Sequence, residues 1–376
     1  MRALWLSLAL LVGAAQVVAA QDAPVEVERA ADARAERIAS WREALELDLA
    51  GEVLASVAAL EGGAASLSAD GEALALYASA LAASGQRDAA RRALRSASED
   101  TTERAAIDVA LAALDLDEDR LAEVEARLAE EDGSVRAELQ DAPRAWFLLG
   151  RARVRAGATG RARVPLEAFV ERWPRHADAP AAWHMLAQEA LERRDLERAR
   201  ECRERGAELG RWHAYYRTRR LQCRANPDAP EPRIGLAQLW IAAEDWNRAR
   251  AELDPVLTRH PEACAAWTTL GELERKQGRL AESRAAYARA VACDPDQHVA
   301  RFALGLLLVD AGEPEAARVE LEALCDDEHA GSDRRFVGAH LALARVLVEL
   351  GDEKSATRRY ARYRELGGTE ALEASR

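Results

Sequence analysis

The chain has few aromatic side chains and no long apolar run after its first twenty residues. Phe, Trp and Tyr make up 5% of the 376 residues, whereas charged side chains make up 31%. A core built mainly from small and aliphatic side chains fits a thin helical array better than a bulky globule. The lack of a second run of about 20 apolar residues predicts that the mature chain does not insert into a membrane.

Catalytic and metal-binding motifs are also missing. The sequence contains no HExxH, paired CxxC, GxSxG or P-loop pattern, and its seven histidines are scattered. Cys325 and His329 stand one helical turn apart, but two ligands do not close a tetrahedral metal site. An acidic loop after a helix explains them better. We therefore expect no metal, no cofactor and no enzymatic activity.

Positive charge is in deficit along the chain. There are 52 Lys and Arg residues against 65 Asp and Glu residues, which gives a net charge of -13. Such a protein repels the phosphates of nucleic acid and the headgroups of anionic lipids. The balance argues against a nucleic-acid partner and leaves a protein or peptide as the expected partner.

What the sequence does contain is a repeat. Trp146, Leu149, Gly150, Gly157, Ala162, Phe169 and Pro174 stand at the same offsets as Trp267, Leu270, Gly271, Gly278, Ser283, Ala290 and Pro295. This 34-residue period fixes the architecture before any single site is considered. The repeats begin near Gly71, Ala105, Pro143, Pro180, Pro230, Cys264, His298 and Val337. Positions within a repeat are counted from these residues.

Each repeat has the pattern of two amphipathic helices joined by a turn. Positions 8 and 20 hold Gly, Ala or Ser in fifteen of sixteen cases. Small residues there predict that the two helices of a repeat cross at close range, at Gly271 and Ser283 in the Cys264 repeat. A helix pair of this size cannot bury its apolar face alone, so neighbours must stack. The predicted fold is all-α, a right-handed α-solenoid of stacked antiparallel helix pairs.

The repeats resemble the tetratricopeptide repeat over roughly residues 71 to 370, as found in exported bacterial proteins. The residues that carry the resemblance are Trp267, Leu270, Gly271, Ser283, Tyr287, Ala290 and Pro295. The chain departs from the family pattern in three ways. Glu274 and Arg153 replace an aromatic residue at position 11, His329 replaces the closing proline, and Arg211 to Ala229 is an irregular insertion.

These observations predict a linear organisation without compact domains. The expected segments are 1–20, a signal peptide; 21–70, an acidic start and a degenerate capping helical pair; 71–142, divergent repeats; 143–213, repeats; 214–229, an irregular helix or linker; 230–370, repeats; and 371–376, a tail. Asn226 to Pro232 holds three prolines. We expect the softest joint of the array there.

Met1 to Ala20 has the pattern of a secretory leader. Arg2 supplies a positive start, Ala3 to Val12 an apolar core, and Val18 to Ala20 a small-residue cleavage site. An uncleaved anchor is the alternative, although the apolar run is short for a bilayer span. We expect a periplasmic or secreted protein that begins at Gln21.

Five cysteines follow the leader. Cys264 opens the first helix of its repeat and Cys293 closes the second, so an antiparallel hairpin brings them together. They form the best disulfide candidate in an oxidising compartment, and Cys202 with Cys223 is a weaker one. Cys325 is left over. The alternative is that these cysteines are small apolar residues that pack between helices.

In the family that the chain resembles, positions 2, 5, 9, 12 and 13 point into the inner, concave face. Carried onto this chain, the resemblance implies a partner-binding groove that contains Arg144, Phe147, Arg151, Arg155, His184, Gln188, Thr268, Glu272, Arg275, Lys276 and Phe302. A basic groove with aromatic residues suits an extended or acidic peptide. The alternative is that these arginines are solvated charges above their own helices.

Three hypotheses of function remain. The leading one is a non-catalytic protein-interaction scaffold of the bacterial cell envelope that binds a peptide or protein segment in the concave groove. The second is self-association into a structural assembly, which leaves the oligomeric state open. The third is an enzyme or carrier whose site the sequence does not reveal. The aromatic and basic cluster from Trp212 to Arg220 is either a contact surface or packing under an extra helix.

Overall fold

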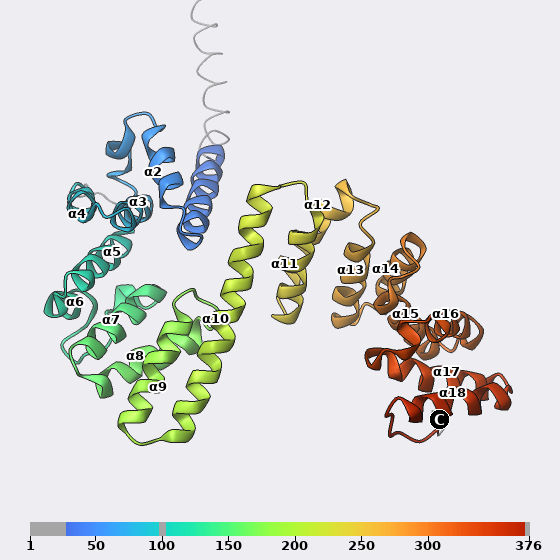
Figure 1. The fold of residues 1–376 in the computed structure, drawn as a ribbon. Coiled ribbons are helices and arrows are strands. Elements are labelled where there is room, and N and C mark those ends of the chain that lie inside the picture. The colour runs from blue at the N-terminus through green and yellow to red at the C-terminus, as the bar shows by residue number, and fades with distance from the viewer. Residues whose placement is uncertain (1–27, 98–102, 373–376) are drawn as a thin grey trace, which may run out of the picture. The chain divides into compact units, whose positions relative to one another are not determined.

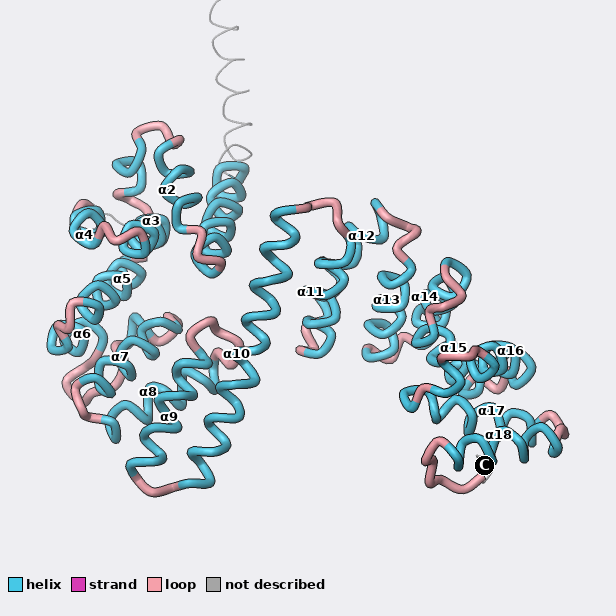
Figure 2. Tube along the Cα trace, viewed as in Figure 1, coloured by secondary structure: helices cyan, strands magenta, loops and turns pink. Residues whose placement is uncertain are grey.

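A computed structural model describes residues 28–97 and 103–372, and Figure 1 shows it as a ribbon. The predicted leader at 1–20 lies outside the described residues. Within the described ranges the fold is all-α, as predicted, and Figure 2 shows helices joined by loops without any strand. No helix in those ranges combines the length and apolar character needed to cross a bilayer.

Eight helix pairs follow one another along the chain. The first helices of the pairs are α3 (Gly71–Ala83), α5 (Arg104–Asp117), α7 (Pro143–Arg155), α9 (Ala179–Glu192), α11 (Pro230–Ala242), α13 (Cys264–Lys276), α15 (His298–Asp310) and α17 (Val337–Glu349). The second helices are α4 (Arg87–Arg95), α6 (Leu121–Leu128), α8 (Thr159–Arg172), α10 (Leu196–Ala225), α12 (Trp246–Arg259), α14 (Leu280–Cys293), α16 (Pro314–Asp326) and α18 (Glu353–Glu365). Helical residues 28–46 and α2 (Ala50–Ala58) precede them.

Short 3₁₀ turns complete the fold. They are η1 (Gly63–Leu67), η2 (Ala137–Leu139), η3 (Ala330–Ser332) and η4 (Arg334–Phe336). The last two occupy the long connection between α16 and α17, where His329 stands in place of the closing proline.

The chain divides into two compact units between Ala214 and Tyr215. We call them the N-terminal and the C-terminal unit. The border lies within α10, so the joint expected at Asn226 to Pro232 is not where the division falls. At 214–229, where an irregular helix or a linker is expected, α10 continues as a regular helix to Ala225. No proline interrupts this stretch, and the helix ends just before the Asn226-Pro227 step.

A left-handed backbone residue at position 15 closes the first helix of every repeat. Five repeats place glycine there, as at Gly278 with φ of 75°. The other three use Asp119, Arg194 and Glu244, with φ between 58° and 62°. This conformation reverses the chain after the first helix and allows the second to return antiparallel to it.

The two helices of a repeat touch most closely at position 8. A Cβ atom added at Gly271 would lie 2.6 Å from the Tyr287 ring, and one added at Gly150 would lie 2.5 Å from Leu166. The Ser283 hydroxyl donates a 2.7 Å hydrogen bond to the carbonyl of Gly271. Glycine leaves space at Gly271 and Gly150 for the side chain at position 24, which lies directly over it, whereas five other repeats hold alanine at position 8.

Adjacent repeats are joined through position 11, whose side chain is buried in all eight repeats. In three of them a charged residue at position 11 pairs with position 21 of the preceding repeat. The pairs are Asp115 with Arg91, Arg153 with Glu125, and Glu274 with Arg250. We call these contacts the inter-repeat ion pairs. They replace the aromatic residue that the family resemblance leads one to expect at this position.

Each inter-repeat ion pair is extended by a further partner, so the buried charge is well satisfied. Asp115 also accepts from Arg120 at 2.8 Å, and Glu274 also accepts from Arg279. Arg153 donates in addition to the carbonyl of Gly133 at 2.6 Å. A buried charge is tolerated only when paired and hydrogen-bonded in this way.

We expect Gly271→Leu to destabilise the C-terminal unit by about 1 to 3 kcal/mol, because the new side chain meets the Tyr287 ring. Chemical denaturation followed by circular dichroism measures the change. Gly210→Ala is the control, since a Cβ there meets nothing within 4 Å and alanine favours the helix. Equal stability of Gly271→Leu and wild type would contradict the close crossing.

Asp115→Asn is expected to destabilise the N-terminal unit by about 3 kcal/mol, because it leaves Arg91 and Arg120 facing a neutral group in a buried place. Asp141→Asn serves as the matched control. Its carboxylate pairs with Arg172 but is 99% exposed, so its loss changes stability by less than about 1 kcal/mol. Similar urea midpoints for both variants would refute a structural role for the buried pair.

Candidate functional site

A pocket lies between α3 and α5 in the N-terminal unit, where the family register expects the inner face. Its volume is about 400 Å³, and its floor is formed by small side chains. The floor residues are Ala78, Ser79, Ala82, Ala83, Ala110, Ala113 and Leu114. Ser79 donates its hydroxyl to the Ala75 carbonyl, so this donor is already used within α3. We call this pocket the inner-face groove.

Charged groups stand at the edge of the inner-face groove. Arg87, Asp117 and Arg144 complete its lining, and all three are exposed. Two cations face one anion, so the edge favours a ligand that carries a carboxylate. An apolar floor with a few charged groups around it is the usual composition of a ligand site.

The predicted arginines of the Pro143 repeat have different surroundings. Arg144 lines the inner-face groove, and Arg151 is exposed on the same helix. Arg155 donates to the Leu116 carbonyl at 2.7 Å and lies 3.5 Å from Asp119, which ties it to the preceding repeat.

Phe147 was predicted to line the groove, and this is wrong. Its side chain is 4% exposed and packs against Phe169, with ring centroids 5.6 Å apart. Position 5 of this repeat is thus buried, although the family register assigns it to the inner face. Phe147 is therefore a core residue and offers no surface to a partner.

Most of the groove was not named from the sequence. Ser79, Ala82, Ala83, Ala113 and Asp117 occupy positions 9, 12 and 13 of the Gly71 and Ala105 repeats. These are the same inner positions that were used for the later repeats. Applying the register to the divergent repeats finds them, although alanine alone gives no signal of binding.

His184 and Gln188 are exposed one turn apart on α9, with 3.4 Å between His184 Nε2 and Gln188 Nε2. They are not among the residues that line the inner-face groove. Their predicted role in binding stays a prediction.

The predicted residues on α13 mostly bond within their own unit. Thr268 donates to the side chain of Gln297 at 3.1 Å. Burial raises the pKa of Tyr287 to about 12, and the neighbouring Arg275 opposes this rise, whereas Glu272 adds to it. Lys276 is exposed at the end of the helix.

An apolar strip continues along α15 in the C-terminal unit. Phe302 is partly buried against Phe336, with ring centroids 6.0 Å apart. On either side of it, Val299 is 55% exposed and Leu306 is 37% exposed. These residues occupy positions 2, 5 and 9 of their repeat, which the family register assigns to the inner face, and they leave apolar surface exposed there.

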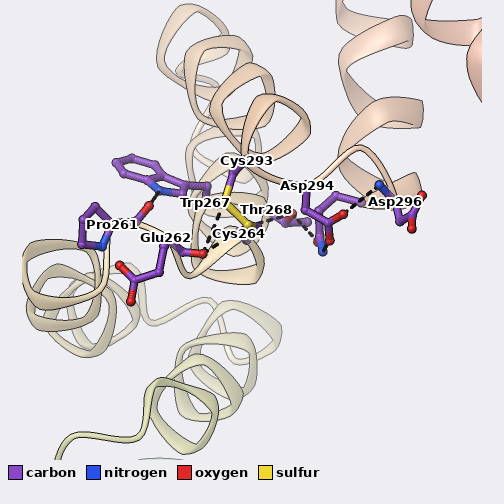
Figure 3. The surroundings of a disulfide bond; sticks show 9 residues. Pro261, Glu262, Cys264, Trp267, Thr268, Cys293, Asp294 and Asp296 are labelled. Carbon is purple, nitrogen blue, oxygen red and sulfur yellow. Dashed lines mark hydrogen bonds between the residues drawn. A yellow bond between two sulfur atoms is a disulfide. The ribbon is translucent and has the colours of Figure 1, made fainter.

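A disulfide joins Cys264 and Cys293, the pair that the repeat register favours, with their Cα atoms 5.6 Å apart. Figure 3 shows it at the open end of the α13 and α14 hairpin, beside Trp267. The carbonyl oxygen of Glu262 lies within 3.3 Å of both sulfur atoms. The indole of Trp267 donates to the Pro261 carbonyl at 2.9 Å, and Arg289 covers its ring at 3.9 Å.

The weaker disulfide candidate does not form, because Cys202 is a buried free thiol. Cys202 and Cys223 lie several turns apart on α10, so their sulfur atoms cannot meet. Cys325 is buried as well, and burial raises the pKa of its thiol to about 12. Within the described residues no group of three His, Cys, Asp or Glu side chains is arranged to hold a metal ion.

The aromatic cluster on α10 is mostly packed. Trp212 lies against His213, with ring centroids 4.9 Å apart, and Tyr216 packs on Trp240 at 5.7 Å. Tyr215 is 38% exposed under Arg219. Burial lowers the pKa of His213, which keeps this histidine neutral at pH 7. Packing therefore accounts for Trp212 and Tyr216.

In sequence, one part of the chain matches a known family. Residues 234–298 match the family model described as tetratricopeptide repeat. No curated protein matches the chain in sequence.

Several solved structures are similar to parts of the chain. MamA is 16% identical, with a TM-score of 0.35, and the likeness covers 48% of this chain and 94% of MamA. YrrB, titled a TPR protein with an unusual peptide-binding site, is 21% identical, with a TM-score of 0.36, covering 40% and 74% of the two chains. Pseudomonas aeruginosa PilF is 18% identical, with a TM-score of 0.34, covering 60% and 92%. At these TM-scores the likeness carries no conclusion about binding.

Reduction of the disulfide is expected to lower the free energy of unfolding of the C-terminal unit by about 2 to 4 kcal/mol. The bond connects residues 29 apart, and opening it returns conformational entropy to the unfolded chain. Denaturation with and without a reductant measures the loss. The double variant Cys264→Ser, Cys293→Ser is the control and should not respond to the reductant. A wild-type midpoint that does not move on reduction would contradict the expectation.

Proposed function

We propose that this chain, which belongs to the tetratricopeptide-repeat family, is a non-catalytic scaffold that holds an acidic, extended peptide segment in its inner-face groove. The observation that carries the proposal is the 400 Å³ pocket between α3 and α5 with Arg144 at its edge. Arg144 is the residue at which the predicted groove and the observed pocket coincide.

The lining suggests what the segment contains. Small floor residues such as Ala82 and Ala113 leave space for apolar side chains of an extended peptide. Arg87 and Arg144 each supply a guanidinium group that can donate two hydrogen bonds to a carboxylate of that peptide. Asp117 repels a further negative charge on the ligand. The net negative charge of the whole chain repels acidic partners in general. The basic edge of the groove attracts only those that place a carboxylate next to it.

The place of action that we propose is the cell envelope or the medium outside the cytoplasm. The leader pattern of Met1 to Ala20 supports export of the chain. The bond between Cys264 and Cys293 supports an oxidising compartment, because such bonds rarely persist in a reducing cytosol.

A displayed peptide library selected on the purified chain tests the proposal. Wild type is expected to enrich peptides that combine acidic and small apolar residues. The best peptide should bind Arg144→Ala about tenfold more weakly, since a charge-assisted hydrogen bond contributes roughly 1.5 to 3 kcal/mol. Ala82→Trp should abolish binding because the indole fills the groove.

Arg205→Ala is the matched control, since this arginine is 63% exposed on α10 and lies outside the groove. It should bind the selected peptide as wild type does. Enrichment of peptides without acidic residues, or unchanged binding by both Arg144→Ala and Ala82→Trp, would discard the proposed groove.

A further inference from the structure

The chain folds back on itself after α18. Residues 367–371 return to contact α17 and α18, and we call them the C-terminal strap. Gly367 turns the backbone with φ of 95°, and a Cβ atom added at Gly368 would lie 2.2 Å from the Tyr363 ring. The strap therefore uses one glycine for a left-handed conformation and the other for a close approach.

Three side chains hold one residue of the strap. The backbone N–H of Glu370 donates to the Tyr363 hydroxyl at 3.0 Å, and the Glu370 carbonyl accepts from the Tyr360 hydroxyl at 3.1 Å. A guanidinium nitrogen of Arg345 on α17 lies 3.4 Å from the Glu370 carboxylate. We call Arg345, Tyr360 and Tyr363 the strap clamp. Main-chain hydrogen bonds combined with a contact to the side chain are also the means by which proteins bind extended peptides.

Arg345 is only partly used by the strap. Its Nη2 atom makes two long contacts, at 3.4 Å to the Glu370 carboxylate and at 3.4 Å to the Ala371 carbonyl. Its Nε–H is buried and finds no acceptor within the described residues. By contrast, Arg34 binds Asp70 through two nitrogens, at 2.7 and 2.9 Å. A carboxylate that met Arg345 in that forked geometry would bind it more strongly than Glu370 does.

The strap itself is held loosely. The side chain of Glu370 is 67% exposed, and Gly367, Thr369 and Ala371 are exposed as well. Two consecutive glycines lose more conformational entropy than other residues when the strap closes. Few buried contacts and exposed hydrogen bonds are typical of segments that open locally. Opening of the strap exposes the strap clamp.

The helix that supplies the two tyrosines is basic. Helix α18 carries five basic side chains and two acidic ones, although the whole chain has a net charge of -13. The basic ones are Lys354, Arg358, Arg359, Arg362 and Arg364. An acidic segment is therefore attracted to this helix.

We infer that the strap clamp binds a glutamate in an extended segment of another protein, in exchange for Glu370. The backbone of that glutamate is held by Tyr360 and Tyr363, and its carboxylate by the Nε and Nη atoms of Arg345. Glu370 is thus an internal ligand that occupies the clamp until a stronger ligand displaces it. This site lies in the C-terminal unit, is separate from the inner-face groove and does not depend on it.

Titration of the full chain with a peptide tests the inference, and the ring resonances of isotope-labelled Tyr360 and Tyr363 are the readout. The probe is the blocked peptide Gly-Gly-Thr-Glu-Ala-Leu, which copies residues 367–372. The variant Glu370→Gln weakens the strap, so it should bind the probe about tenfold more tightly than wild type does. Glu365→Gln is the matched control, because this glutamate is 64% exposed on α18 and lies outside the clamp. It should bind the probe as wild type does.

A second peptide, with glutamine in place of glutamate, shows whether the clamp recognises the charge. Glu370→Gln should bind this peptide about tenfold more weakly than the probe. Adding Arg345→Ala should remove the preference, so that the two peptides bind alike. An unchanged preference in the double variant, or equal binding of the probe by wild type and Glu370→Gln, would overturn the inference.

Two further measurements distinguish other roles of the strap. If the strap opens, the Glu370 amide exchanges its hydrogen at least about a hundredfold faster than the amide of Ala344 in the core of α17. Equal protection of the two amides would make the strap a fixed cap and contradict the inference. Light scattering should find wild type monomeric at the titration concentration. A dimer that Glu370→Gln dissociates would assign the clamp to the strap of a second copy and also overturn the inference.

Discussion

The stack of repeats depends on what fills position 11, because this side chain meets the second helix of the preceding repeat. Leucine or tryptophan fills it in four repeats through apolar contact, and in three others an ion pair takes over. A buried ion pair adds little net stability compared with an apolar pair, but it admits only a partner of opposite charge. Position 11 thus helps to specify the order in which the repeats stack. Similar repeats could otherwise stack in a wrong order.

The inner face shows how the same architecture creates space for a ligand. Alanine at inner positions of α3 and α5 keeps the helix backbones close to the surface of the groove and leaves the volume between them open. Larger residues at the same positions of α15, Val299 and Leu306, instead project a ridge of apolar surface. The inner positions of the two units therefore differ in shape, with small side chains in one and exposed larger apolar side chains in the other.

Much of the fold could be predicted from the sequence because the repeat fixes many residues at once. Helices α3, α7, α11, α13, α15 and α17 begin at the residues from which the repeats were counted. The length of α10 escaped prediction, since a helix without a breaker has no sequence signal for where a normal second helix would stop. Of the groove residues, Arg144 follows from the register, whereas the burial of Phe147 against Phe169 does not, because the register assigns position 5 to the inner face.

The turns at position 15 differ in the conformational free energy that their left-handed backbone costs. An L-residue in the left-handed region is disfavoured by about 1 kcal/mol relative to glycine, and Asp119, Arg194 and Glu244 all bear this cost. These three turns lie in the first five repeats, whereas the last three repeats have glycine throughout. We therefore expect the hairpins that turn at Asp119, Arg194 and Glu244 to open at a lower cost in free energy than the hairpins that turn at glycine, and their amides to exchange sooner.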